Sequence, residues 1–194
     1  VTCFEMNDQI GGNLVYKDKT GHSSVFKTTH IISSKKFSEY TDFPRPEDYP
    51  DYPSGAELLA YFNSYVEKYN LKKFIKFNTN VKKAVNIDNK WKLFFDDLSE
   101  DYDYLVVANG HHWSPRIPTF EGEFSGELMH SHQFKNNEYF KDKSVLVVGG
   151  GNSACDIAVE VSRVAKKTSI SMRRGYHFIP VSYTHLTLPT NVAV

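Results

Sequence analysis

A helical spacing of apolar residues marks the segment 55–69. An α-helix turns once in about 3.6 residues, so positions three and four apart share one face. The apolar positions with this spacing are Leu58, Leu59, Phe62, Tyr65, Val66 and Tyr69. The stripe predicts an amphipathic helix against a core, and we interpret its aromatic residues as core residues.

Short apolar runs predict strands on both sides of this helix. The expected strands are residues 1–5, 74–77, 81–87, 91–95 and 104–108. Polar residues 88–90 join the third and fourth runs, which predicts a hairpin. Residues 13–53 are rich in Ser, Thr and Pro and are expected to be mostly loop.

A different pattern follows residue 142. Residues 143–148 form an apolar run, three glycines follow, residues 152–165 have the character of a helix, and residues 168–172 that of a strand. Strand, glycine turn, helix and strand in this order are typical of a βαβ dinucleotide-binding unit.

The small residues of this turn have separate tasks in such a unit. Gly149 allows the tight turn, Gly151 lets the backbone approach a pyrophosphate, and Ala154 lets the helix pack closely on the strand. The helix N-terminus then offers N–H groups and a positive dipole end to the phosphates. The alternative is a glycine-rich turn that serves packing alone.

The residues after the second strand of this unit bear on the choice of nucleotide. In a site for NAD, an acidic residue at this strand end binds the ribose 2′-hydroxyl. Here the strand is followed by Arg173 and Arg174, with no acid nearby. Because a guanidinium group suits a 2′-phosphate, NADP is expected rather than NAD. The alternative for either arginine is a solvated loop charge.

The start of the chain indicates a second nucleotide-binding half. The apolar run at residues 1–5 ends in Glu5, and Gly11 and Gly12 follow. This order resembles the second strand of another dinucleotide unit, with Glu5 placed for a ribose hydroxyl. The first strand, glycine turn and helix of that unit are then expected to precede residue 1.

Composition further narrows the classes of protein to which this chain can belong. The chain has 194 residues, is 40% hydrophobic, and carries 23 basic and 23 acidic residues, so its net charge is zero. Because the chain has no excess of basic residues to attract a polyanion, nucleic acid is not an expected partner. Cys3 and Cys155 lack metal-ligand spacing and are expected to be small core residues in a reducing, cytoplasmic setting. No apolar run is long enough to span a bilayer. No metal site is expected. Membrane association and oligomeric state stay open.

Four motifs together resemble the flavin-containing monooxygenase family. YLVVANG followed by HHWSPRIP (104–118) resembles the A-T-G-x-x-x-x-P-x-x-P segment of flavoproteins with two dinucleotide-binding domains. FSGELMHSHQF (124–134) resembles the signature F-x-G-x-x-x-H-x-x-x-[YF]. DFPRPEDYPDYP (42–53) resembles the family's proline-rich loop, and Arg173-Arg174-Gly175 with Pro180 also fits.

The resemblance implies an α/β fold with two Rossmann-like dinucleotide-binding domains, of which the FAD half and the NADP half are both incomplete. The expected boundaries are 1–118 for the FAD half and 119–180 for the NADP half. The resemblance assigns Glu5, Gly12, Ala108 and Gly110 to FAD. It assigns Gly149, Gly151, Asn152, Ser153, Ala154, Cys155, Asp156, Arg173 and Arg174 to NADP(H).

The resemblance also implies an activity. Such enzymes use NADPH to reduce FAD, and the reduced flavin and O₂ form a C4a-hydroperoxyflavin that oxygenates a soft nitrogen or sulfur nucleophile of a small molecule. No catalytic residue can be named from the sequence. Two alternatives stay open: an NADPH-dependent flavoprotein reductase without oxygen transfer, and an inactive nucleotide-binding fragment that does not retain FAD.

Three positions depart from the family pattern. Asn109 stands for the threonine of A-T-G, and Leu14 stands where a tryptophan is common. FKTTHIISSK (26–35) resembles a segment whose asparagine lies near the flavin, and Ile32 falls on that asparagine. Since isoleucine cannot donate a hydrogen bond, either His30 or a serine replaces it, or oxygen activation is altered; the alternative for His30 is an ordinary loop histidine.

Residues 181–194 are expected not to be native sequence. VSYTHLTLPT (181–190) matches the translation of a transposon-end sequencing adapter, and the family has no counterpart for it after Pro180. We therefore assign no function to His185 or to any residue beyond 180.

Overall fold

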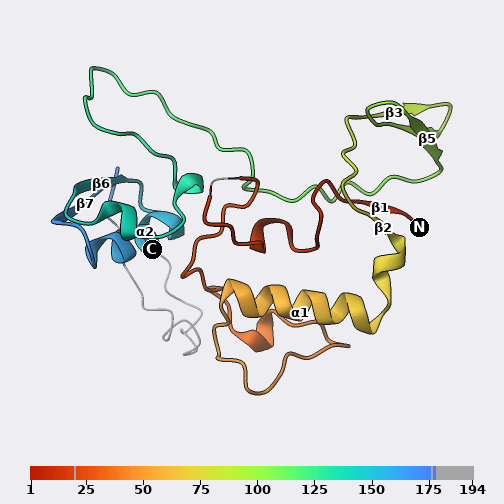
Figure 1. The fold of residues 1–194 in the computed structure, drawn as a ribbon, viewed down its shortest axis with the longest axis horizontal. Coiled ribbons are helices and arrows are strands. Elements are labelled where there is room, and N and C mark those ends of the chain that lie inside the picture. The colour runs from red at the N-terminus through yellow and green to blue at the C-terminus, as the bar shows by residue number, and fades with distance from the viewer. Residues whose placement is uncertain (20, 176, 178–194) are drawn as a thin grey trace. The chain divides into compact units, whose positions relative to one another are not determined.

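The computed structural model describes residues 1–19, 21–175 and 177, and residues 178–194, with the adapter-like segment, lie outside this part. It forms two compact units, Val1–Lys135 and Asn136–Val194. Figure 1 traces the chain and labels both α-helices and most of the strands. The expected boundary between the FAD half and the NADP half, after residue 118, concerns complete domains and stays a prediction.

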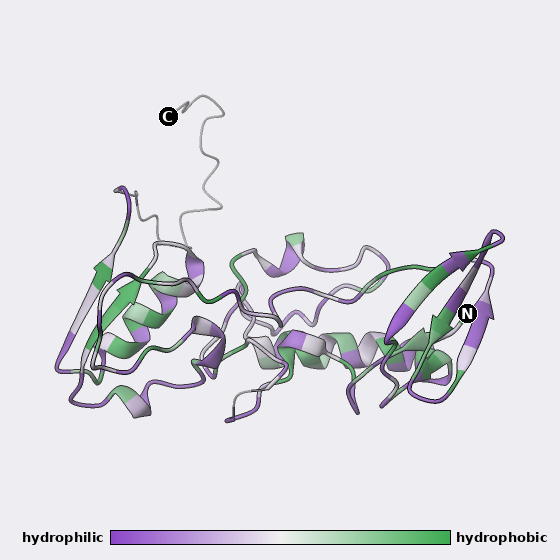
Figure 2. Cartoon of the chain, turned by 90° about the horizontal axis from the view of Figure 1, so that it is seen from above, coloured by the Kyte–Doolittle hydropathy of each residue, from purple (hydrophilic) through white to green (hydrophobic). Residues whose placement is uncertain are grey.

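The first unit is built around helix α1 (Gly55–Lys68), which ends at Tyr69 as expected. The helix carries hydrophobic and hydrophilic residues along its length (Figure 2). Tyr61 is its most buried side chain, at 2% exposure. Its hydroxyl accepts a hydrogen bond from the Tyr40 N–H (2.8 Å) and donates one to the Phe43 carbonyl (2.5 Å). The helix face around Tyr61 therefore packs on the loop that precedes the helix, although the predicted stripe did not include this residue. Of the stripe's own aromatic residues, Phe62 and Tyr65 are half-buried and Tyr69 is 38% exposed, so the expectation that they are core residues holds only in part.

A capping box starts helix α1. The Glu57 N–H donates to the Ser54 hydroxyl oxygen (3.3 Å), and the Glu57 carboxylate accepts from the Ser54 N–H (2.7 Å). This reciprocal pair satisfies two N–H groups that have no partner within the helix. The bond from the Ser54 backbone also lowers the pKa of Glu57.

The strands of this unit form two small sheets. Strand β1 (Cys3–Phe4) pairs in parallel with β2 (Ile75–Lys76). The expected hairpin is β3 (Lys83–Ile87) and β4 (Lys90–Phe94), and β5 (Ser99–Tyr102), which the sequence did not predict, pairs antiparallel with β4.

The expected strand at 104–108 is wrong. A strand needs a neighbour for its backbone N–H and C=O groups, and none of the described residues pairs with this segment. Most of its apolar side chains lie in solvent, with Tyr104 at 90%, Val106 at 85% and Val107 at 74% exposure, whereas Leu105 is half-buried.

The second unit is one βαβ turn. Strand β6 (Ser144–Val148) leads to helix α2 (Asn152–Ser162), and β7 (Lys167–Ser171) returns parallel to β6. Helix α2 packs on both strands through Ile157, Ala158 and Val161, which are all buried. The order predicted from the sequence is confirmed, although α2 ends three residues earlier than residue 165.

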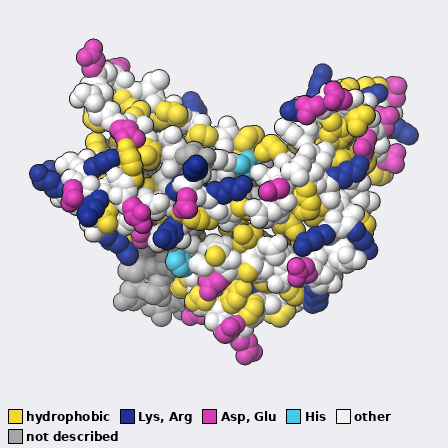
Figure 3. All heavy atoms as spheres, in the orientation of Figure 1, with side chains coloured by type: hydrophobic (Ala, Val, Ile, Leu, Met, Phe, Trp, Pro, Cys, Tyr) yellow, Lys and Arg dark blue, Asp and Glu magenta, His cyan; other side chains and the backbone are white. Residues whose placement is uncertain are grey.

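The surface carries both signs of charge. Basic and acidic side chains are interspersed over the face shown in Figure 3, in keeping with the zero net charge. Among the described residues, no helix has the length and apolar character needed to cross a membrane.

The capping box gives a first prediction. Ser54→Ala should destabilise the first turn of α1 by about 1 kcal/mol, because it leaves the Glu57 N–H without its cap. The folded pKa of Glu57 is depressed, so its share of this stabilisation is present above the unfolded pKa and lost as the pH falls. Amide hydrogen exchange of α1 at pH 7 and below pH 4 measures both effects.

Ser64→Ala is the matched control, since Ser64 is exposed in mid-helix and its hydroxyl bonds only the Ala60 carbonyl. Equal protection of the first turn in both variants would contradict the capping account.

Candidate cofactor-binding sites

The glycine turn of the second unit is shaped by one backbone hydrogen bond. The N–H of Gly149 donates to the carbonyl of Ser171, at 2.9 Å, so the turn is fixed to the end of β7. Gly149 has φ 131°, a conformation that residues with a side chain rarely adopt. A Cβ at Gly149 would lie 3.7 Å from the Ala154 methyl group, which shows how closely the helix packs on the turn.

The N-terminus of α2 is open for a ligand. Gly151 is its N-cap, no side chain caps the helix, and a Cβ at Gly151 would meet nothing within 4 Å. Asn152 and Ser153 are exposed. The N–H of Cys155 already bonds the Gly151 carbonyl (3.1 Å), so the amides available to an anion are those that precede it.

The remaining predicted residues of this half lie close by in sequence. Ala154 and Cys155 are half-buried, and Asp156 is exposed on the second turn of α2. Arg173 and Arg174 are exposed and follow the end of β7.

Parallel pairing brings the turn and the arginines to one edge. Val148, the last residue of β6, is opposite Ser171, the last residue of β7. The glycine turn and Arg173 therefore leave the same end of the strand pair, where nucleotides bind in open α/β sheets. An open helix N-terminus, a side-chain-free turn and a nearby cation fit the pyrophosphate and 2′-phosphate of NADP(H).

In the first unit, Glu5 is held at the end of β1. Its N–H donates to the Lys76 carbonyl (3.0 Å), and its carbonyl accepts from the Thr79 N–H (2.9 Å). Its Oε1 accepts from the backbone and side-chain N–H groups of Asn7, at 2.7 and 2.8 Å. Within the described residues Oε2 has no hydrogen-bond partner, so this oxygen keeps its capacity to accept a hydrogen bond.

Contacts from Asn13 and His22 bring the glycine pair at 11–12 and the segment after Gly110 together. Asn13 Nδ2 donates to the His111 carbonyl, and the His22 ring stacks on the Trp113 ring with centroids 5.6 Å apart. The sequence motifs did not single out Asn13 or His22, because neither residue belongs to a family motif quoted above. These contacts join residues that are far apart in sequence, so no local sequence pattern predicts them.

The backbone beside these contacts leaves open space next to two glycines. Gly12 and Gly110 have φ of 48° and 71°, and a Cβ on either would meet nothing within 4 Å. Ala108 is exposed. The Asn13 Oδ1 atom is buried and has no hydrogen-bond partner in the part of the chain described. Open backbone and an unsatisfied acceptor are features that a bound flavin nucleotide would use.

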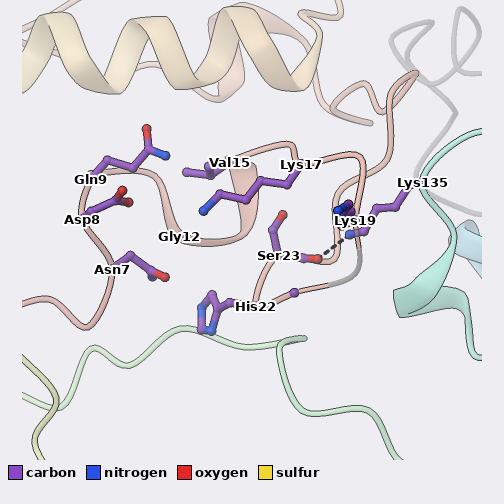
Figure 4. Close-up of a pocket in the computed structure, with 11 residues that line it drawn as sticks. Asn7, Asp8, Gln9, Gly12, Val15, Lys17, Lys19, His22, Ser23 and Lys135 are labelled. Carbon is purple, nitrogen blue, oxygen red and sulfur yellow. Dashed lines mark hydrogen bonds between the residues drawn. The ribbon is translucent and has the colours of Figure 1, made fainter. Parts of the chain in front are cut away.

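A pocket of about 110 Å³ lies beside Gly12 (Figure 4). Its wall includes Asp8, Lys17, Lys19, His22 and Lys135. Lys135 is the only buried one of these charged residues, at 5% exposure, and burial lowers the pKa of its ammonium group.

Ile32 and His30 lie on the segment that departs from the family pattern. Ile32 is 58% exposed. His30 is also exposed, and its Nδ1 lies 2.8 Å from the Thr28 carbonyl. This favours the reading of His30 as a loop histidine engaged with its own backbone.

The β6–α2–β7 unit places the chain in the Rossmann-like α/β class. The family model described as flavin-binding monooxygenase-like matches residues 1–194, and the chain belongs to this family. Dimethylaniline monooxygenase (N-oxide-forming) 2 from Macaca mulatta is 37% identical over 189 residues, which cover 90% of this chain and 35% of the relative. The chain thus spans about a third of the length of the curated relatives it matches.

Solved structures of related enzymes show the same fold. S-allyl-L-cysteine S-oxygenase from Allium sativum has a TM-score of 0.84 and 26% identity, over 92% of this chain and 47% of that one. Tmm from Pelagibacter sp. strain HTCC7211 has a TM-score of 0.84 and 33% identity, over 90% and 44%. The expected Rossmann-like α/β class and the family are confirmed.

The two glycines of the turn give a second prediction. Gly151→Ala should change the stability of the fold by about 1 kcal/mol or less, since its φ of −81° suits alanine and the added methyl meets nothing, although alanine is a poorer N-cap than glycine. It should weaken NADP(H) binding about tenfold or more, because the methyl enters the space expected for the pyrophosphate.

Gly149→Ala should instead destabilise the fold, because alanine is strained at φ 131°. Urea unfolding measures the stability of both variants, and calorimetric titration measures their affinity for NADP(H). Unchanged NADP(H) affinity in Gly151→Ala would show that the phosphates bind elsewhere.

Proposed function

We propose that this sequence is the nucleotide-binding part of an NADPH- and FAD-dependent monooxygenase that transfers one oxygen atom from O₂ to a soft nitrogen or sulfur nucleophile of a small molecule. The observation that carries the proposal is the β6–turn–α2–β7 unit with Arg173 at the same edge as the glycine turn, in a chain of the flavin-binding monooxygenase-like family. The names of the relatives specify N-oxide formation and S-oxygenation, which supports this substrate class.

The second unit would hold NADP(H). Gly149 and Gly151 leave room for the pyrophosphate, the N–H groups of Asn152, Ser153 and Ala154 face it, and Arg173 with Arg174 would pair with the 2′-phosphate. Cys155 and Asp156 stay predicted contacts, through side chains on the first two turns of α2.

The first unit would hold FAD, which supplies the redox chemistry when bound. Glu5 would accept from the adenosine ribose, and Gly12, Ala108 and Gly110 would let the backbone run close to the cofactor. The residues of this chain would orient the cofactor and limit the access of water. A cytoplasmic location stays part of the proposal, in keeping with two free cysteines. The expectation that both are core residues is wrong for Cys3, which is exposed, whereas Cys155 is half-buried.

The direct test uses the full-length protein, meaning a polypeptide that spans the length of the curated relatives. Incubation with NADPH, ¹⁸O₂ and a tertiary amine or a thioether should yield an oxide that carries one ¹⁸O atom. NADPH oxidation with an unlabelled, unoxygenated substrate would support the reductase alternative. One observation favours that alternative: the exposed Ile32 provides no hydrogen-bond donor at the family's asparagine position.

Nucleotide choice gives a third prediction. Replacing Arg173 and Arg174 together by Ala should weaken NADPH binding about ten- to a hundredfold, because charge-assisted hydrogen bonds to the 2′-phosphate are lost. NADH binding should change little, since NADH lacks that phosphate. Binding titrations of both nucleotides measure the effect. Equal affinities for NADPH and NADH in the unmutated protein would contradict the assignment.

Oxygen use gives a fourth prediction. In the full-length protein without substrate, NADPH oxidation should release hydrogen peroxide readily, because Ile32 cannot donate a hydrogen bond near the flavin. Ile32→Asn should lower the peroxide released per NADPH oxidised, and Ile32→Leu is the control. A peroxide yield that is already low in the unmutated protein would contradict this interpretation of Ile32.

A further inference from the structure

Lys135 is a buried cation without a carboxylate partner among the described residues. Its side chain is 5% exposed, and its Nζ donates to the carbonyls of Ser23 (2.6 Å) and Val25 (3.3 Å). Figure 4 shows the bond to Ser23 at the pocket beside Gly12. Lysine is rarely this buried unless its charge is engaged. An ammonium group in such a place therefore needs an explanation.

The contacts around Lys135 connect two segments distant in sequence. The Lys27 N–H donates to the Lys135 carbonyl (2.9 Å), His132 Nε2 lies 3.2 Å from the His22 carbonyl, and the Phe134 ring meets the Phe26 ring edge-on at 5.2 Å. Residues 132–135, which are the end of the F-x-G-x-x-x-H signature and the lysine that follows it, thus lie along residues 22–27. We refer to this pairing as the clasp.

The clasp fixes one end of the segment that carries Ile32. Farther along this segment, the Gly55 N–H donates to the Thr29 carbonyl (2.8 Å) and the Ile31 N–H donates to the Pro53 carbonyl (3.0 Å). The other end of the clasp reaches the glycine pair, because the Ser23 hydroxyl donates to the Asn13 carbonyl (2.6 Å). Residues 22–27 therefore connect the Gly11–Gly12 turn to the segment containing Ile32.

We propose that Lys135 is a positioning residue for the flavin site: its ammonium group gathers the carbonyls of Ser23 and Val25 and so sets the path of residues 22–27. The proposal rests on the proposed function for the identity of the cofactor. The carbonyls converge on one atom, and removing that atom leaves two acceptors, at Ser23 and Val25, without their donor. An ammonium group has three N–H donors, and two of them are used here.

The test compares variants of the 194-residue chain by amide hydrogen exchange, which needs no cofactor. Lys135→Met keeps the length of the side chain but removes the donors, and it should speed exchange in residues 22–29 about tenfold while α1 is unaffected. Lys135→Arg retains charge and donors and should restore most of the protection. Lys17→Met, an exposed lysine of the same pocket, is the control and should match the unmutated chain.

A second readout uses the full-length protein with bound FAD. Lys135→Met should change the visible circular dichroism of the flavin, and Lys135→Arg should return it toward the unmutated signal. Because the exchange experiment does not depend on FAD, failure of the proposed function leaves its result intact. Fast exchange throughout α1 in both Lys135→Met and Lys135→Gln would overturn the proposal in favour of general stabilisation. Protection of residues 22–29 equal to that in Lys17→Met would overturn it as well.

Discussion

The hydrogen bond from the Gly149 N–H to the Ser171 carbonyl is the contact on which the nucleotide site depends. It continues the parallel pairing of β6 and β7 by one residue and makes the chain turn at that point. Because Gly149 has φ 131°, the chain can then start α2 with its N-terminal amides clear of side chains. The same pairing places Val148 opposite Ser171, so the proposed phosphate-binding amides and Arg173 follow the same end of the strand pair.

The first unit is organised differently. Its parallel pair β1–β2 has two residues in each strand, so its loops are held by turns and side-chain contacts, among them those of the clasp. Glu5, Asn13 and Lys135 each bond backbone or side-chain groups that the sheet does not hold. Tyr104, Val106 and Val107 stay exposed, because the described residues offer no neighbouring strand.

The sequence predicted the parts whose signal is local. Helical spacing located α1 within one residue at its C-terminal end, and the glycine turn located β6, α2 and β7. Strand β5, Ser-Glu-Asp-Tyr, was missed because three of its four residues are polar and its formation depends on pairing with β4.

Long-range contacts account for the other differences. The segment 104–108 has a strand-like composition, yet strand formation depends on a neighbour rather than on composition. Asn13, His22 and Lys135 were missed as site residues because their partners lie far away in sequence, up to 112 residues in the bond from Lys135 to Ser23.

The most direct test of this account is an amide chemical-shift titration of the ¹⁵N-labelled 194-residue chain with NADP⁺ and with NAD⁺. Both nucleotides should shift the amides of residues 150–154, where the helix N-terminus is open, and Gly149 should move less because its N–H is already bonded. Only NADP⁺ should shift residues 172–174. Shifts that spare residues 150–154, or that are the same for both nucleotides at residues 172–174, would contradict the account.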